Sequence, residues 1–222
     1  MKESVFGLNK YIDHTNLKAF ATGADIEKLC DEAVRYGFMS VCANPCYVPL
    51  VKKLLAGSGV LTCTVIGFPL GANSASIKAA EATQAYGEGC DEFDMVINIG
   101  ALKDGKHGYV RDEISAVLDA VNGRTVKVII ETGLLTDSEK ETAVRICCDA
   151  GAHFVKTCTG VSPGVATVED IALMKRVIQD CGMADKVRIK ASSGIKTRES
   201  ALALINADAV RLGTSSGIEI VG

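Results

Sequence analysis

Short runs of apolar and β-branched residues recur along the whole chain, and each run predicts a strand. Seven runs are clear, and an eighth around Tyr11-Ile12-Asp13 is weaker. The clear runs are Met39–Ala43, Leu61–Ile66, Phe93–Asn98, Val126–Ile130, Phe154–Thr157, Val187–Ala191 and Ala209–Leu212. Segments with helical spacing of apolar residues lie between them, as in Asp25–Val34 and Ser138–Ile146.

Capping residues support the predicted helices. Thr136 and Glu139 form a capping-box pattern, and Thr167 with Asp170 forms a weaker one. Glycine stands where three helix C-caps are expected, at Gly37, Gly151 and Gly182. The chain therefore alternates between strands and helices from one end to the other.

Eight strand-then-helix units, one in about every 28 residues, predict an α/β chain folded as a (β/α)8 barrel. We expect a single domain over residues 1–222 that is close to the minimal size of this fold. A doubly wound open sheet is the alternative, but no G-x-G-x-x-G motif follows an early strand. Chemistry is therefore expected on strand ends and short loops.

Composition narrows the class of protein. The net charge of -3, with no run of Lys and Arg, argues against a nucleic-acid partner. No apolar stretch is long enough to cross a membrane, and Met1–Asn16 carries no secretion signal, so we expect a cytoplasmic protein.

Cysteine and histidine usage argues against disulfides and metal sites. The nine cysteines are an odd number without C-x-x-C spacing, and we interpret them as reduced thiols. Only three histidines are present, which we expect to be structural or on the surface: His14, His107 and His153. We therefore predict no metal cofactor.

Alternation within the strands directs ionisable side chains toward the barrel interior. The inward set comprises Glu92, Asp94, Lys127, Glu131, Lys156, Arg188, Lys190 and Arg211, although the alternation around Lys156 is less clean. Burying unpaired charges is costly, so these groups must compensate one another or serve a reaction. For Lys127, Glu131, Arg188 and Arg211 both interpretations stay open. For Asp94, Lys156 and Lys190 we favour catalysis.

Lys156 and Lys190 lie near the ends of neighbouring predicted strands, where barrel active sites form. If both enter one pocket, each cation should lower the pKa of the other and expose a free amine. A free amine forms a Schiff base with a carbonyl, and Asp94 could then move protons directly or through water.

Three successive loops combine Gly with Ser or Thr and predict a phosphate site. They follow Lys156, Lys190 and Arg211 and contain Thr157–Gly164, Ala191–Gly194 and Gly213–Gly217. Loops of this kind expose backbone N–H groups, and the loops after the last two barrel strands commonly bind phosphate. Residues Ser216 to Val221 are expected to form a short helix there.

The motifs F-D-M-V-I-N-I-G, V-K-T-C-T-G and I-K-A-S-S-G-I-K-T make the chain resemble the deoxyribose-phosphate aldolase family over nearly its whole length. The resemblance implies a metal-free class I aldolase on a (β/α)8 barrel, in deoxynucleoside catabolism. Its reaction joins acetaldehyde reversibly to glyceraldehyde 3-phosphate, so the partners are small aldehydes and a sugar phosphate. It also implies a homo-oligomer, a dimer or tetramer.

The resemblance assigns roles to individual residues. Lys156 matches the Schiff-base lysine, Lys190 the second lysine and Asp94 the proton-relay carboxylate. Cys42 and Asp13 match residues close to the site, although Cys42 as a buried apolar thiol is our preferred interpretation. The implied phosphate-binding residues are Gly160, Ser193, Gly194, Ser215 and Ser216.

Three departures from the family pattern are visible. Ser193 replaces the first of two glycines, and a positive φ there would be strained. The stretch Val161–Gly164 lacks a basic phosphate contact, and the sequence stops at Gly222 without a Tyr-terminated tail. A transaldolase-like Schiff-base lyase and a non-catalytic sugar-phosphate-binding barrel are the alternative functions.

Overall fold

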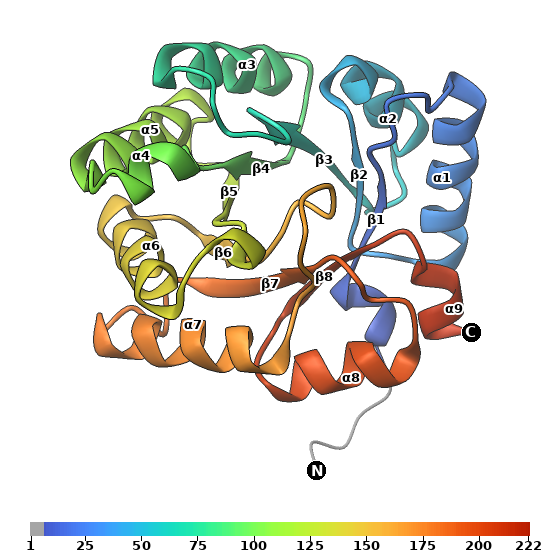
Figure 1. Cartoon of the computed structure of the whole chain (residues 1–222). Helices are drawn as coiled ribbons and strands as arrows, with labels where there is room; N and C mark the ends of the chain where they lie inside the picture. Colours follow the sequence, from blue (N-terminus) through green and yellow to red (C-terminus); the bar gives the residue numbers. More distant parts are fainter. Residues whose placement is uncertain (1–6) are drawn as a thin grey trace.

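Eight parallel strands close into one barrel, in chain order from β1 to β8 (Figure 1). The computed structural model describes residues 7–222. Residues 1–6, the start of the Met1–Asn16 segment in which we expect no secretion signal, lie outside the described residues. The strands are β1 (Ile12–Asn16), β2 (Ser40–Ala43), β3 (Leu61–Ile66), β4 (Glu92–Val96), β5 (Thr125–Ile129), β6 (Phe154–Lys156), β7 (Arg188–Ser192) and β8 (Arg211–Thr214). The predicted fold class is confirmed.

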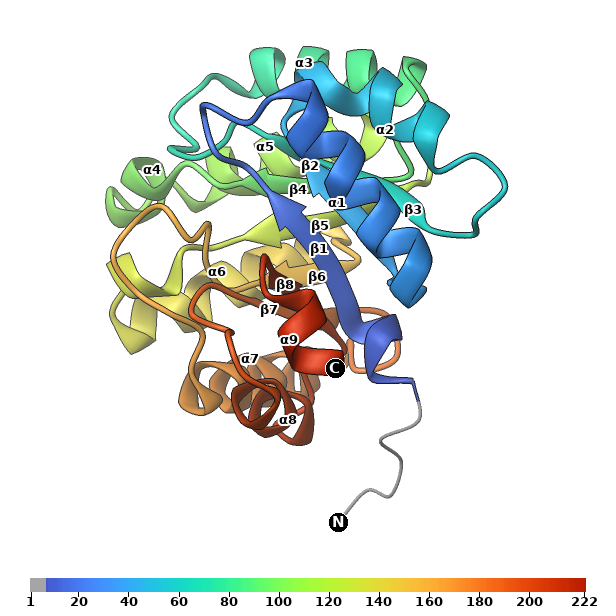
Figure 2. The same ribbon diagram turned by 90° about the vertical axis from the view of Figure 1, so that its right-hand side faces the viewer.

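Helices surround the barrel and cover its outer face (Figure 1). They are α1 (Gly23–Tyr36), α2 (Val48–Leu54), α3 (Ala75–Gly87), α4 (Ile99–Lys103), α5 (His107–Ala120), α6 (Asp137–Ala150), α7 (Val168–Asp180), α8 (Arg198–Asn206) and α9 (Gly217–Val221). Three 3-10 turns are η1 (Leu8–Tyr11), η2 (Pro45–Tyr47) and η3 (Thr132–Leu134). Figure 2 shows α9 beside β1, so the last residues pack near the first strand.

Strand positions agree with the sequence pattern to within a few residues. Among the seven clear runs, the largest shift is in β8, which spans Arg211–Thr214 instead of Ala209–Leu212. In the first strand Tyr11 belongs to η1, and the strand runs on to Asn16. The capping box at Thr136 and the left-handed caps at Gly37 and Gly151 are confirmed. In α7, which ends at Asp180, the C-cap is Cys181, one residue before the expected Gly182.

The main core lies between the outer face of the barrel and the helices. Phe93, Met95, Val126 and Val128 are fully buried there, as the alternation predicts. The opposite parity of the same strands fills the interior with charged side chains, including Asp94 and Lys127 as register partners. Apolar burial outside thus leaves the interior free for polar chemistry.

Arg188 corrects one prediction. It has inward parity, but it stands at the first position of β7, where the barrel opens to solvent, and its side chain is exposed. Its guanidinium lies 4.3 Å from the ring centroid of Phe154. It therefore forms a cation–π contact at this opening and does not join the interior charge network.

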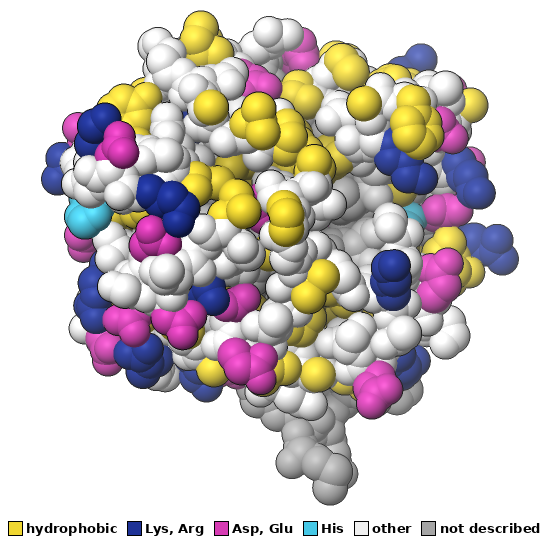
Figure 3. All heavy atoms as spheres, in the orientation of Figure 1, with side chains coloured by type: hydrophobic (Ala, Val, Ile, Leu, Met, Phe, Trp, Pro, Cys, Tyr) yellow, Lys and Arg dark blue, Asp and Glu magenta, His cyan; other side chains and the backbone are white. Residues whose placement is uncertain are grey.

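Charged side chains of both signs are interspersed on the face shown in Figure 3, in keeping with the small net charge. No helix within residues 7–222 combines the length and apolar character needed to span a membrane. The nine cysteines, all within the described residues, are free thiols, as predicted.

A buried ion pair outside the barrel holds the end of β4. Lys78 on α3 and Glu113 on α5 are fully buried, with Nζ 2.6 Å from Oε2. Lys78 Nζ also donates to the carbonyl of Val96 at 2.8 Å, and Glu113 Oε1 accepts from the backbone N–H of Asn98 at 2.5 Å. Two helices are thereby tied to the loop that follows Asp94's strand.

Replacing Lys78 by Met is expected to lower the free energy of unfolding by about 3–5 kcal/mol, because Glu113 loses its buried partner. Equilibrium urea unfolding measures this change. Lys103→Met is the matched control, since the Lys103–Glu139 pair is 42% and 28% exposed and should contribute less than about 1 kcal/mol. Equal losses in both variants would contradict a special role for the buried pair.

Candidate active site

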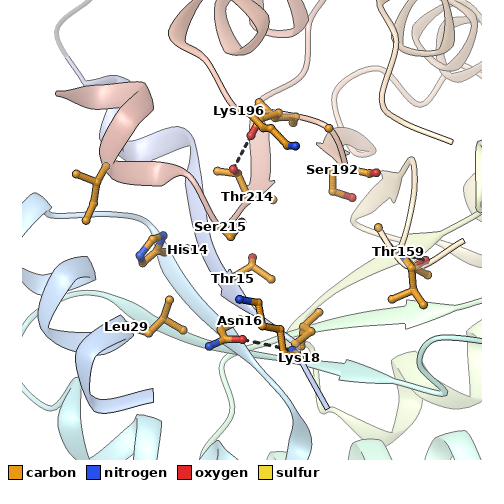
Figure 4. Close-up of a pocket in the computed structure, with 18 of the residues that line it drawn as sticks. His14, Thr15, Asn16, Lys18, Leu29, Thr159, Ser192, Lys196, Thr214 and Ser215 are labelled. Carbon is orange, nitrogen blue, oxygen red and sulfur yellow. Dashed lines mark hydrogen bonds between the residues drawn. The ribbon is translucent and has the colours of Figure 1, made fainter. Parts of the chain in front are cut away.

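A pocket of about 620 Å³ opens at the carboxyl ends of the strands. Its walls come from the loops after β1, β6, β7 and β8, together with parts of α1 and α9. Figure 4 shows Ser192 and Lys196 on one side of this pocket and Asn16 and Lys18 on the opposite side. Lys156 also borders it, and the remaining charged residues of the barrel interior lie beneath.

Asp94 is the centre of the buried charge network. Its Oδ2 accepts from Lys156 Nζ and Lys190 Nζ, both at 2.7 Å. Its Oδ1 accepts from Lys127 Nζ at 2.8 Å. Asp94 and Lys190 are fully buried, and Lys156 is 3% exposed. The structure therefore brings together the three predicted catalytic residues.

A second layer of charges lies below Asp94. Asp13 Oδ2 is 2.5 Å from Lys190 Nζ, and Asp13 Oδ1 pairs with Arg211. Glu92 Oε2 lies 2.6 Å from Arg211 and 2.8 Å from Lys127 Nζ. Lys127 and Arg211 thus belong to the interior network, the first of the two interpretations left open by the sequence.

Strand register explains why the charges meet. Lys156 on β6 is the register partner of Lys190 on β7, and Lys190 is the partner of Arg211 on β8. A Cβ on Gly213 would lie 3.1 Å from Lys190 Cε, so glycine at this point of β8 leaves room for the lysine stem. Lys156, Lys190 and Arg211 therefore lie side by side on three adjacent strands.

The expected lowering of a lysine pKa is wrong for Lys190. Burial disfavours its charged form, but Asp13 and Asp94 outweigh burial and raise the pKa of Lys190 above its usual value. Burial also acts against the charged form of Asp94, yet Lys127, Lys156 and Lys190 hold the pKa of Asp94 well below its usual range. Lys190 is therefore a stable ammonium and Asp94 a stable carboxylate.

Four cations share the interior with three carboxylates. The cations are Lys127, Lys156, Lys190 and Arg211, and the carboxylates are Asp13, Glu92 and Asp94. Among the four, Lys156 alone borders the pocket, where a carbonyl compound can approach its Nζ.

The loops expected to hold phosphate surround the pocket mouth. Gly160 and Gly194 have φ of 83° and 76°, and Ser193 has φ of 82°. Ser193 therefore has the positive φ that strains a residue with a side chain, and its Oγ donates to the carbonyl of Gly164 at 2.9 Å. Ser215 lines the pocket, whereas the backbone N–H of Ser216 donates to Thr214 Oγ1 at 2.9 Å.

Cys42 and Glu131 do not border the pocket. Cys42 is fully buried, as expected, in a cluster against which Leu17 and Phe68 pack, but an Asp94 oxygen lies within 4.8 Å of its Sγ, so its surroundings are not purely apolar. Glu131 has φ of 58° beyond the end of β5, so strand alternation no longer applies to it. Its Oε2 accepts from Thr159 Oγ1 at 2.5 Å, which fixes the loop after Lys156.

Lys196 is a site residue that the sequence argument missed. It lines the pocket two residues after Gly194, and Figure 4 shows it on the same side as Thr214. Its position two residues after the predicted phosphate loop Ala191–Gly194 indicates that its side chain can reach a bound phosphate. Lys196 supplies a cation near these loops, where Val161–Gly164 offers none.

One group of metal-ligand side chains occurs within residues 7–222. It consists of Cys42, Cys63 and Asp94, whose ligand atoms lie within 4.8 Å of one another. Lys127 Nζ is 2.8 Å from Asp94 Oδ1 and 3.4 Å from Cys63 Sγ. An ammonium group therefore already serves as the counter-charge where a metal would bind.

Comparison with known proteins agrees with this geometry. A deoxyribose-phosphate aldolase of Finegoldia magna is 58% identical over 214 residues, covering 96% of this chain and 98% of that protein. A deoxyribose-phosphate aldolase of Caldicellulosiruptor saccharolyticus is 54% identical, covering 96% of both chains. The tetrameric deoxyribose phosphate aldolase structure from Aeropyrum pernix has a TM-score of 0.88 at 32% identity, covering 96% of this chain and 89% of that one.

The family model for DeoC/LacD aldolases matches residues 8–221, which is nearly all of the described barrel. The chain therefore belongs to the DeoC/LacD family of aldolases.

Proposed function

We propose that this chain is a deoxyribose-phosphate aldolase of the class I, metal-independent type. It would cleave 2-deoxy-D-ribose 5-phosphate reversibly into D-glyceraldehyde 3-phosphate and acetaldehyde. The observation that carries the proposal is the contact of Lys156 Nζ, at the pocket wall, with Asp94 Oδ2, which Lys190 Nζ also contacts. The names of the relatives support the choice of substrate.

The reaction begins when the neutral Lys156 amine attacks the aldehyde carbon of the open-chain sugar. Loss of water from the resulting carbinolamine gives an iminium ion, which withdraws electrons from the adjacent carbon. Removal of the proton of the 3-hydroxyl group then breaks the bond between carbons 2 and 3. Glyceraldehyde 3-phosphate leaves, and the two-carbon enamine stays on Lys156 until it is protonated and hydrolysed to acetaldehyde.

Asp94 and Lys190 have different roles in the proton transfers. The ionised Asp94 is 2.7 Å from Lys156 Nζ, so together with water it can accept and return protons, and it holds the iminium ion by charge. Lys190 is 2.7 Å from the same carboxylate oxygen and keeps its proton, so its positive charge holds Asp94 ionised and in position. Asp13 holds Lys190 in position from below.

The substrate phosphate would bind at the pocket mouth. Gly160, Ser193, Gly194 and Ser215 line this region, and positive φ at the first three shapes turns whose backbone N–H groups can bind anions. Ser216 is the N-cap of α9, and its backbone N–H donates to Thr214 Oγ1 at 2.9 Å. Lys196 adds the positive charge that a phosphate dianion requires.

The remaining properties follow from this assignment. We propose a cytoplasmic enzyme without a cofactor, acting in deoxynucleoside catabolism, with Cys42 near the two-carbon end of the substrate. A homo-oligomer, a dimer or tetramer, is supported by the tetrameric relative from Aeropyrum pernix.

Replacing Lys190 by Leu is expected to lower kcat for 2-deoxyribose 5-phosphate at least about 100-fold, because the charge that holds Asp94 ionised and in position is lost. Acetaldehyde release, coupled to its reduction, measures the rate, and circular dichroism checks the fold. Lys186→Met, which removes an exposed lysine just before β7, should keep the parent rate. Full turnover by Lys190→Leu would favour the transaldolase-like alternative. If the parent chain itself released no acetaldehyde, the non-catalytic sugar-phosphate-binding barrel would be favoured instead.

Replacing Lys196 by Met is expected to raise KM for 2-deoxyribose 5-phosphate about tenfold, which corresponds to about 1.4 kcal/mol of lost phosphate binding. KM for unphosphorylated 2-deoxyribose should stay the same, since that sugar lacks the anion. Lys28→Met is the matched control, because Lys28 lines the pocket from α1 and lies 3.9 Å from Glu32. A proportional rise in KM for both sugars would refute the phosphate contact.

A further inference from the structure

Two free thiols lie side by side beneath the pocket. Cys42 on β2 and Cys63 on β3 are register partners on adjacent parallel strands, and both are almost fully buried. Adjacent strands are separated by about 4.8 Å, which lies within the Cα separation of roughly 4.4–6.8 Å found for disulfides. Their two Sγ atoms and an Asp94 oxygen all lie within 4.8 Å of one another.

The two sulfur atoms differ in chemical character. A hydrogen bond from Cys63 lowers the pKa of Cys42, whereas burial and this same contact raise the pKa of Cys63 well above its usual value. Cys42 is therefore the better nucleophile, and Cys63 is the protonated neighbour. A reactive thiol beside a second thiol is the arrangement in which oxidation ends in a disulfide.

A small oxidant can approach this pair through the pocket. Leu17 and Phe68 pack against the cluster that contains both cysteines, and both also line the pocket. Asp94, which Lys156 contacts from the pocket wall, is 3.3 Å from Cys63 Sγ through Oδ1. Movement of Leu17 or Phe68 would thus connect the pocket with the thiols. Hydrogen peroxide is smaller than acetaldehyde, which the pocket is proposed to release.

We propose that Cys42 and Cys63 form an oxidative modification site, in which hydrogen peroxide converts the dithiol to a disulfide. The Cys42 thiolate attacks one peroxide oxygen, giving a sulfenic acid and, with one proton, water. Cys63 then attacks the sulfenic sulfur, forming the S–S bond and releasing the second water. Two thiols are oxidised and one peroxide is reduced, and a dithiol reductant reverses the change.

The disulfide would alter the reaction centre through Asp94. Cys63 Sγ now lies against Asp94 Oδ1 and receives a hydrogen bond from Lys127 Nζ at 3.4 Å. Drawing this sulfur toward β2 removes both contacts and changes the position of the carboxylate. A small displacement of a reacting group lowers rates strongly, so we expect oxidation to reduce kcat about tenfold or more.

The bond is measured by mass spectrometry after peroxide treatment and alkylation under denaturing conditions. Trypsin leaves Cys42 on peptide 36–52 and Cys63 on peptide 54–78, and the proposal predicts that these peptides are linked. Cys46, which is exposed, shares the first peptide, so Cys46→Ser is the background for mapping. Dithiothreitol should separate the peptides and restore the rate.

Variants identify which thiols matter. Cys63→Ala should lose peroxide sensitivity when its oxidised rate is compared with its own reduced rate. Cys181→Ser should be as sensitive to peroxide as the parent chain. Cys181 contacts the thiol of Cys148, and this second pair of thiols does not line the pocket. The activity measurements rest on the proposed aldolase reaction, whereas the bond is read by mass alone. Absence of the linked peptide, or unchanged inactivation of Cys63→Ala, would overturn the proposal.

Discussion

Asp94 is a buried carboxylate that the Nζ atoms of three lysines surround, and the chemistry of the barrel depends on this arrangement. Lys127, Lys156 and Lys190 reach it from three successive strands, each within 2.8 Å of one of its oxygens. An isolated charge in such a place would be very costly, so each member of the network is stabilised by the others. The network also gives two lysines different tasks. Lys190 is enclosed by carboxylates and remains charged, whereas Lys156 faces the pocket and can act as an amine.

The short loops do more than connect strands to helices. Glu131 turns away from the barrel and binds Thr159, which fixes the segment between Lys156 and Gly160. On the other side, the Lys78–Glu113 pair binds backbone groups just beyond Asp94. These two sets of polar contacts hold the ends of the strands that carry Lys156 and Asp94. Within residues 7–222, buried polar contacts between the barrel's own elements perform this task.

Much of the fold and of the catalytic centre was predictable from local sequence. The alternation of apolar and polar residues indicates that Asp94 and Lys190 point inward, because successive side chains of a regular strand point to opposite faces. It failed at Glu131, where the backbone leaves the strand, and at Arg188, where the barrel opens to solvent. Local sequence indicates a lowered pKa for Lys190, but its pKa is raised. Asp13, which helps to raise it, lies on β1 and is far from Lys190 along the chain. Lys196 and the contact between Cys42 and Cys63 depend on distances between loops or strands, which a linear pattern does not contain.

The central claim is that Lys156 is the nucleophilic amine and Lys190 the permanent cation beside it. The most direct test is to incubate the protein with acetaldehyde and sodium borohydride and to map the reduced adduct by peptide mass spectrometry. Reduction converts an imine to a stable N-ethyl group, so the modified lysine is identified directly. The account predicts one ethyl group, on Lys156, and none on Lys190. An adduct on Lys190, or no adduct within the barrel, would contradict it.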